Sequence, residues 1–132
     1  MNLVSIRIIT DDVAALAGFY ERVTGTTAVH LSEHFAELRT PQGTLAIGST
    51  ATVDLFGPGS VRPAANASAI IEFLADDVDA TYLSLRSWVT TFVNEPTTMP
   101  WGNRSLLLRD PDGNLVNLFT PVTTEAIARF SV

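Results

Sequence analysis

Apolar and polar residues alternate in short runs along most of this chain, and two longer stripes have helical spacing instead. Residues 3–9 and 69–75 have the alternation of β-strands, and each run is followed by aspartates that can cap a helix. The apolar stripe of the first predicted helix consists of Val13, Leu16, Phe19, Tyr20 and Val23. The stripe of the second consists of Val78, Tyr82, Leu85 and Val89. Gly25 is placed to end the first helix in a left-handed conformation.

The remaining short apolar runs predict strands. In the first half of the chain these are residues 26–30, 35–39 and 44–48, and in the second half residues 90–93, 103–108 and 114–120. Residues 51–67 contain Gly57-Pro58-Gly59 and Pro63 and are predicted to be an irregular connector. Residues 94–102 are predicted to be a loop long enough to overhang a site, and residues 123–132 a last short helix.

The chain contains the same pattern twice. The frame of residues 38–47 recurs at residues 108–117, an offset of 70 (109 − 39), and the helix-capping Asp12 recurs as Asp77, an offset of 65 (77 − 12). Asp110, Pro111 and Gly113 suit a tight turn between two strands of the second copy. Two copies of this length suggest a duplicated module in which neither half has enough core to stand alone.

The predicted fold class is therefore α+β, with two tandem βαβββ modules in one domain of residues 1–132. Module one covers about residues 1–50 and module two about residues 68–122, with residues 51–67 as a linker and residues 123–132 as a C-terminal helix. A chain of 132 residues with 46% hydrophobic residues is long enough for one core.

Composition narrows the possible functions. The net charge is −6, and all eight basic residues are arginine, so we expect no nucleic-acid partner and no anionic membrane partner. The acidity mildly favours a cationic small molecule, although acidity also serves solubility. The chain has no cysteine and no run of eighteen apolar residues, and it lacks a signal-peptide pattern, so we expect a cytoplasmic location.

The segments Phe19-Tyr20-Glu21-Arg22-Val23 with Gly25 and Arg109-Asp110-Pro111-Asp112-Gly113-Asn114 make the chain resemble the vicinal oxygen chelate superfamily. This superfamily comprises glyoxalases, bleomycin-resistance proteins and extradiol dioxygenases, and the resemblance covers nearly the whole chain. It implies paired βαβββ modules whose sheets curl around a cavity. It also implies a homodimer, often with the site between chains.

Metal-dependent members of that superfamily supply His or Glu from the first strand of each module and Glu from the last strand. Counting from Asp12 and Asp77 places the first-strand positions at Ser5 and Ile70, and the last-strand positions fall at Ile47 and Asn117. None of these four side chains is a good ligand for a transition metal. We therefore expect neither a metal nor another cofactor.

Side chains on the same strand faces are the candidates for binding a small organic ligand. They are Ser5, Arg7, Glu72, Trp101, Arg104, Asn117 and Phe119. Arg7 and Glu72 are equivalent through the 65-residue offset, so they could pair with each other or each orient a polar ligand. The predicted function is metal-independent sequestration of a small molecule, as in bleomycin-resistance proteins. The alternative is a lyase, isomerase or dioxygenase with a non-standard or metal-free site, in which a buried Glu72 would be the general base.

Overall fold

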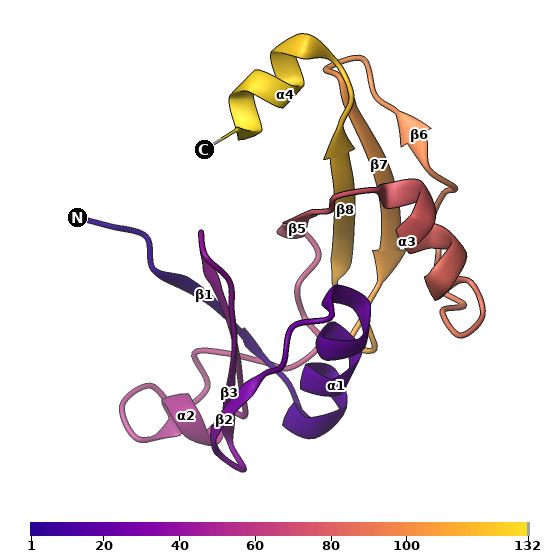
Figure 1. Cartoon of the computed structure of the whole chain (residues 1–132). Coiled ribbons are helices and arrows are strands. Elements are labelled where there is room, and N and C mark those ends of the chain that lie inside the picture. Colours follow the sequence, from indigo (N-terminus) through magenta and orange to yellow (C-terminus); the bar gives the residue numbers. More distant parts are fainter. Residues whose placement is uncertain (132) are drawn as a thin grey trace. The chain divides into compact units, whose positions relative to one another are not determined.

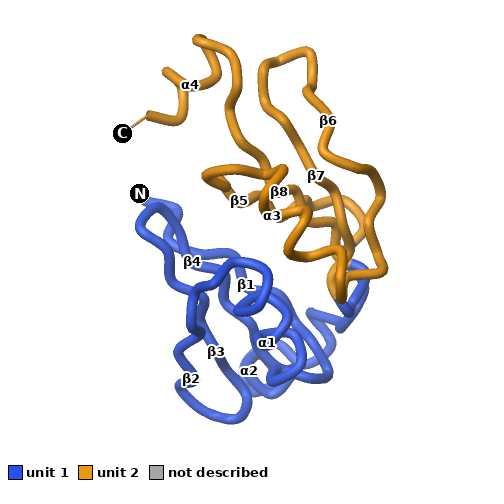
Figure 2. Tube along the Cα trace, turned by 45° about the vertical axis from the view of Figure 1, so that its right-hand side comes forward, with its two compact units in different colours: residues 1–66, 111–113 blue, residues 67–110, 114–132 orange. Residues whose placement is uncertain are grey.

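The computed structural model describes residues 1–131 and divides the chain into two compact units. Unit 1 contains residues 1–66 and 111–113, and unit 2 contains residues 67–110 and the chain after residue 113 (Figure 2). Each unit holds one copy of the predicted βαβββ module. The fold class predicted from the sequence is confirmed.

Unit 1 is a four-stranded mixed sheet with one long helix (Figure 1). Its elements are β1 (Ser5–Ile9), α1 (Val13–Thr24), β2 (Val29–Ser32), β3 (Phe35–Arg39), β4 (Thr44–Gly48) and the short helix α2 (Ala51–Asp54). The strand order is β1-β4-β3-β2, in which β1 runs parallel to β4 and the other neighbours are antiparallel. β1 is therefore an edge strand of this sheet.

The ends of α1 are fixed by the residues that the sequence indicated. The Asp12 carboxylate accepts a hydrogen bond from the Ala15 amide at 3.0 Å, which satisfies one of the free donors of the first turn. Gly25 ends the helix with φ 73°, and its amide donates to the Glu21 carbonyl. One face of α1 packs on β3 and β4, and the buried residues of this core include Leu16, Ala17, Tyr20, Ala36, Leu38 and Ile47.

Unit 2 repeats this arrangement with its own helices. Its elements are β5 (Ile70–Leu74), α3 (Val78–Leu85), β6 (Thr97–Thr98), β7 (Asn103–Arg109), β8 (Leu115–Pro121) and α4 (Thr124–Phe130). The strand order is β5-β8-β7-β6, with β5 parallel to β8. The Asp77 and Thr123 side chains cap α3 and α4. The buried core includes Val78, Leu85, Leu106, Leu108, Val116 and Leu118.

The two copies differ by one residue at the turn before the last strand. Arg39 pairs with Thr44 in unit 1, whereas Arg109 pairs with Leu115 in unit 2, so the second turn is one residue longer. Pairing across the sheets matches Arg7 with Ala46 and Glu72 with Asn117. The structural counterpart of Asn117 is consequently Ala46, and the prediction of Ile47 for this position is wrong.

Two local predictions are also corrected. Residues 51–67 are not wholly irregular, because Ala51–Asp54 forms the short helix α2 before Gly57 and Pro58. Residues 90–93 do not form a strand and make only one isolated bridge, between Phe92 and Leu108. The Leu107 amide donates to the Asn94 side chain at 2.7 Å instead of to a neighbouring backbone carbonyl, so regular pairing starts only at β6.

The helices of the described chain are short. Among residues 1–131, none is long and apolar enough to cross a membrane.

Candidate functional site

Each sheet has one face that its own long helix covers and one that this helix leaves open. In unit 2, α3 packs on β7 and β8. Paired residues of neighbouring strands point to the same side of a sheet. The register therefore places on the face opposite α3 the three β5–β8 pairs Ile70 with Leu115, Glu72 with Asn117, and Leu74 with Phe119. We call these six residues the open face of unit 2.

A carboxylate and an amide are joined at the centre of this face. The Asn117 Nδ2 donates a hydrogen bond of 2.8 Å to the Glu72 Oε2. Because a carboxylate accepts hydrogen bonds and a carbonyl oxygen cannot donate one, this bond fixes the orientation of the Asn117 amide. The Asn117 Oδ1 is then turned away from Glu72, and it is buried without a hydrogen-bond partner. The pair therefore presents one ionised acceptor and one acceptor that lacks a donor.

Apolar side chains surround these acceptors. Ile70 and Leu74 lie on either side of Glu72 along β5 and are 50% and 49% exposed. Both side chains therefore offer accessible apolar surface next to the two acceptors. Next to Leu74, Phe119 is buried because Phe130 of α4 packs edge-on against it, with ring centroids 5.0 Å apart. The open face thus suits a ligand that combines an N–H donor with an apolar body.

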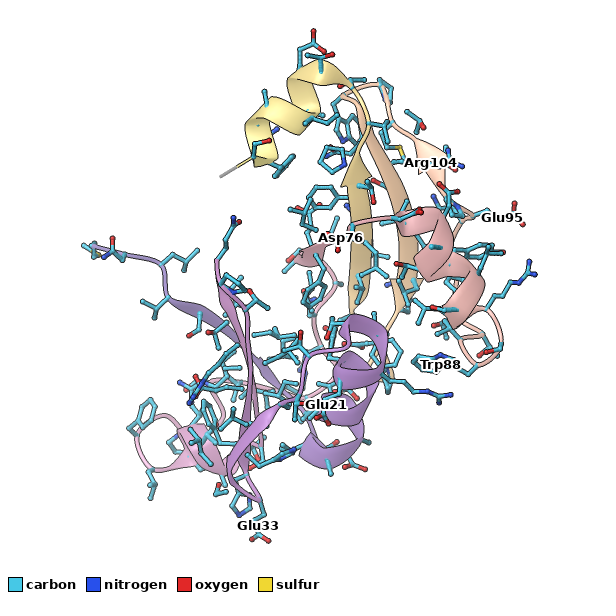
Figure 3. The ribbon with its side chains drawn as sticks, viewed as in Figure 1. Glu21, Glu33, Asp76, Trp88, Glu95 and Arg104 are labelled. Atoms are coloured by element: carbon cyan, nitrogen blue, oxygen red, sulfur yellow. The ribbon has the colours of Figure 1, made fainter. Side chains whose placement is uncertain are left out.

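Arg104 does not belong to this face. It pairs with Thr120, one register position away from Phe119, and therefore points to the side of α3. Its guanidinium forms two hydrogen bonds to the Asp79 carboxylate of α3, at 2.8 and 3.0 Å, and a third to Thr98. Figure 3 shows Arg104 beside α3 and β6. The sequence pattern placed Arg104 with Glu72 and Asn117 among the ligand-binding candidates. In the structure it lies on the other face of the sheet.

The ion pair shifts both groups in the direction that favours their charged forms. The pKa of Asp79 is lowered below its usual 3.8, mainly by the hydrogen bond from Arg104. Partial desolvation opposes this shift, and the positive charge of Arg104 adds to it. The same hydrogen bond raises the pKa of Arg104. Arg104 is thus tied to α3 as a structural residue. The first-turn position of Asp79 on a helix was the sequence signal that could have revealed this partner.

Trp101 lies in the turn between β6 and β7. This turn is closed by the Gly102 amide, which donates to the Met99 carbonyl at 2.9 Å, and by the Met99 amide, which donates to the Asn103 carbonyl. The indole of Trp101 is 65% exposed. The ligand-binding role of Trp101 stays a prediction, since its ring is accessible for stacking.

Unit 1 has the equivalent open face, with different chemistry. Ser5 pairs with Thr44 and Arg7 with Ala46 on this face, and both Ser5 and Arg7 are exposed. The Arg7 guanidinium lies 5.9 Å from the centre of the Phe35 ring and donates a long hydrogen bond to a backbone carbonyl of α2. At the position where unit 2 has the acceptor Glu72, unit 1 therefore has the donor Arg7. The idea that Arg7 pairs with Glu72, from the other unit, stays a prediction.

The donor set does not fit a divalent metal ion. Corrected for register, the two pairs of strand positions carry Ser5 and Ala46 in unit 1, and Ile70 and Asn117 in unit 2. An alanine and an isoleucine cannot ligate, and neutral hydroxyl and amide oxygens bind transition metals poorly. Within residues 1–131, no group of three or more His, Cys, Asp or Glu side chains is arranged to hold a metal.

Comparison with known proteins agrees with the fold. The family model described as "Glyoxalase/Bleomycin resistance protein/Dioxygenase superfamily" matches residues 2–118. The chain therefore belongs to this superfamily. No curated protein matches the sequence.

Solved structures superpose on the chain at low sequence identity. A glyoxalase/bleomycin resistance protein/dioxygenase family enzyme from Burkholderia phytofirmans PsJN matches with a TM-score of 0.79 and 19% identity, over 92% of this chain and all (100%) of that chain. A protein of the same description from Nocardioides matches with a TM-score of 0.75 and 19% identity, over 94% and 85% of the two chains. TioX from Micromonospora sp. ML1 matches with a TM-score of 0.69 and 20% identity, over 92% and 100%. At these identities the matches establish the fold.

Proposed function

We propose that this protein is a metal-independent binding protein of the bleomycin-resistance kind, which sequesters a small organic molecule bearing an N–H donor, preferably a cationic amine. The observation that carries the proposal is the Glu72–Asn117 pair on an apolar open face. Exposed Ile70 and Leu74 would cover the apolar body of the ligand. Its donor would meet the Glu72 carboxylate and, after a small movement of the amide, the unpartnered Asn117 Oδ1.

The energetics favour a ligand of this class. A buried acceptor without a donor destabilises the free protein by about 1–3 kcal/mol, and a ligand that supplies the donor recovers this free energy on binding. A cation next to a carboxylate adds a charge-assisted hydrogen bond, which is roughly twice as strong as a neutral one. The net charge of −6 would further attract a cation.

The alternative role of Glu72 as a general base receives less support. That role was expected to depend on a buried carboxylate, and Glu72 is exposed, with its Oε2 engaged by Asn117. An exposed carboxylate next to an apolar surface suits recognition of a donor better than proton abstraction.

A thermal-shift screen tests the proposal. The probes are bleomycin-like glycopeptides and aromatic drugs with an amine, compared with quinones and uncharged aromatic molecules. A ligand at a hundredfold excess over its Kd stabilises a protein by about 2.7 kcal/mol, which gives a measurable rise in Tm. We expect the amine-bearing probes to raise Tm more than the uncharged ones.

Two matched substitutions locate the binding. Glu72→Gln removes the charge on the open face, whereas Glu95→Gln removes a charge from an exposed residue elsewhere in unit 2. We expect the first to abolish the preference for amines and the second to preserve it. Equal effects of the two, or no stabilisation by any probe at concentrations far above micromolar, would refute the proposal. Stoichiometric zinc, nickel, manganese or iron in the purified protein would also contradict it.

We also propose a homodimer. β1 and β5 are edge strands of their own sheets. Ile6 on β1 and Ile70 and Leu74 on β5 are large exposed aliphatic residues, as are Leu3 and Val4 just before β1. Exposed apolar edges are prone to pair with another chain. Sedimentation velocity of the screened samples should therefore give the mass of a dimer. A single species of 14.2 kDa would exclude it.

A further inference from the structure

A serine and a histidine meet at one end of the unit 1 sheet, away from the residues considered above. Phe35 and Gly48 form the last pair between β3 and β4, and the next residues outward are His34 and Ser49. The His34 Nδ1 lies 2.9 Å from the Ser49 Oγ. On the other side of the ring, the His34 Nε2 lies 3.2 Å from the Glu33 Oε1.

The neighbouring carboxylate favours one tautomer of the His34 imidazole. An ionised carboxylate attracts an N–H group, so the position of Glu33 favours the tautomer with the proton on the His34 Nε2. In a neutral imidazole the Nδ1 is then the unprotonated nitrogen, and it accepts the hydrogen bond from the Ser49 hydroxyl. The lone pair of an imidazole is thus directed at a serine proton, which is the relation between base and nucleophile in serine-dependent acyl transfer.

The backbone holds both partners in place. The Ser49 amide donates to the His34 carbonyl at 2.9 Å, and the Ser49 carbonyl accepts from the Thr52 amide and hydroxyl at 3.0 and 2.8 Å. The His34 amide donates to the Ser32 hydroxyl at 3.1 Å. These bonds fix the backbone at the two strand ends that carry the His34 and Ser49 side chains. The His34 side chain is 52% exposed, so a small molecule can reach it.

We infer that Ser49 is a nucleophile activated by His34, and that it takes the acyl group of small esters with good leaving groups. The Ser49 Oγ attacks the ester carbonyl while its proton passes to the His34 Nδ1. The resulting tetrahedral intermediate collapses, the bond from the carbonyl carbon to the leaving oxygen breaks, and the His34 proton is transferred to the departing phenolate. The products are O-acyl-Ser49 and the free phenol. Glu33 is highly exposed at the tip between β2 and β3 (Figure 3), so its part is limited to orienting the imidazole.

The sequence did not reveal this pair. No Gly-x-Ser-x-Gly segment is present, and no local pattern in the sequence links His34 to Ser49. His34 and Ser49 are 15 residues apart and become neighbours only through the register of the β3–β4 hairpin.

Site-resolved acetylation by 4-nitrophenyl acetate tests the inference. The chain has no lysine, which removes the side-chain amines that usually dominate such labelling. Peptide mapping by mass spectrometry then compares Ser49 with Ser60, an exposed serine whose hydroxyl donates to the Gly57 carbonyl. We expect Ser49 to be acetylated at least tenfold faster than Ser60. This is less than the usual effect of a positioned base, because the site is exposed.

Three variants separate the roles. Ser49→Ala should remove the acetylated peptide, and His34→Gln should slow acetylation of Ser49 at least tenfold. The control His30→Gln should leave the rate unchanged within about twofold. Circular dichroism verifies that each variant is folded. The comparison of Ser49 with Ser60 is made in the wild-type protein, so it does not depend on the folding of any variant. Equal rates at the two serines, or an unchanged rate in His34→Gln, would overturn the inference.

Discussion

The buried turn before β8 allows a quantitative test of how the second module is held together. Asp110 and Asn114 are 3% and 1% exposed and bond to each other three times. The Asn114 amide donates to the Asp110 Oδ1 at 2.9 Å, the Asn114 Nδ2 to the Asp110 Oδ2 at 2.8 Å, and the Asp110 amide to the Asn114 carbonyl at 3.0 Å. Of these three bonds, the substitution Asn114→Ala removes the second, since the other two use the backbone of Asn114.

The expected loss of stability follows from the charge on Asp110. A hydrogen bond to a charged group contributes about 1.5–3 kcal/mol, and here both partners are buried. Asn114 does not have a positive φ, so alanine can adopt the same backbone without strain. We therefore expect Asn114→Ala to lower the free energy of unfolding of unit 2 by about 2–3 kcal/mol.

The first module provides the matched control. In its shorter turn, the Thr40 hydroxyl donates to the Gly43 carbonyl at 2.6 Å, and neither group is charged. Thr40→Ala should cost less than about 1 kcal/mol, the usual contribution of a neutral hydrogen bond. Urea unfolding followed by far-UV circular dichroism measures both variants. Tryptophan fluorescence in the same titrations reports on unit 2, because both tryptophans, Trp88 and Trp101, belong to it. A loss below about 0.5 kcal/mol for Asn114→Ala would refute this account of the turn.

Two further predictions concern unit 2. The pKa of Asp79 is lower in the folded protein than in the unfolded chain. The ion pair therefore stabilises the fold fully at pH values above the pKa of the unfolded chain. This stabilisation is lost as the pH falls through the folded-state pKa. Urea titrations should show Asp79→Asn less stable than wild type at pH 7, with the difference closing below about pH 4; a difference independent of pH would contradict the pairing with Arg104. Gly102 has φ +93°, and an added Cβ would clash with Thr123, the cap of α4, whereas Gly113 with φ +83° has open space around it. Gly102→Ala should therefore lower Tm more than Gly113→Ala, and the reverse order would refute the close approach.

Much of the fold could be predicted because its signals are local. The caps Asp12 and Asp77, the helical stripes and the turn of Asp110 each depend on a few neighbouring residues. The repeat then linked the two halves and gave the order of helices and strands along each module. The segment of residues 90–98 was predicted poorly because the Asn94 side chain takes the place of a backbone acceptor, a tertiary contact that has no periodic signal.

The candidate site was predictable in part for the same reason. Glu72 and Asn117 share a face through the alternation of β5 and β8, which is visible in the sequence. Arg104 was misplaced because one position along β7 moves a side chain to the other face of the sheet. The contact of Phe119 with Phe130 depends on how α4 folds back, and the pairing of His34 with Ser49 on hairpin register.

The single extra residue in the second turn shows why counting along a repeat is unreliable for chemistry. A constant offset of 70 matches Asn117 with Ile47, which is a buried core residue. The strand pairs instead match Asn117 with Ala46, which lies on the open face. Since side chains alternate between faces, an error of one residue exchanges a core position for a site position. With the register corrected, the open face of unit 1 has a methyl group and a guanidinium where that of unit 2 has an amide and a carboxylate. The duplication therefore repeats the backbone but not the chemistry of the face. At these two paired positions, only the second copy has side chains that accept hydrogen bonds.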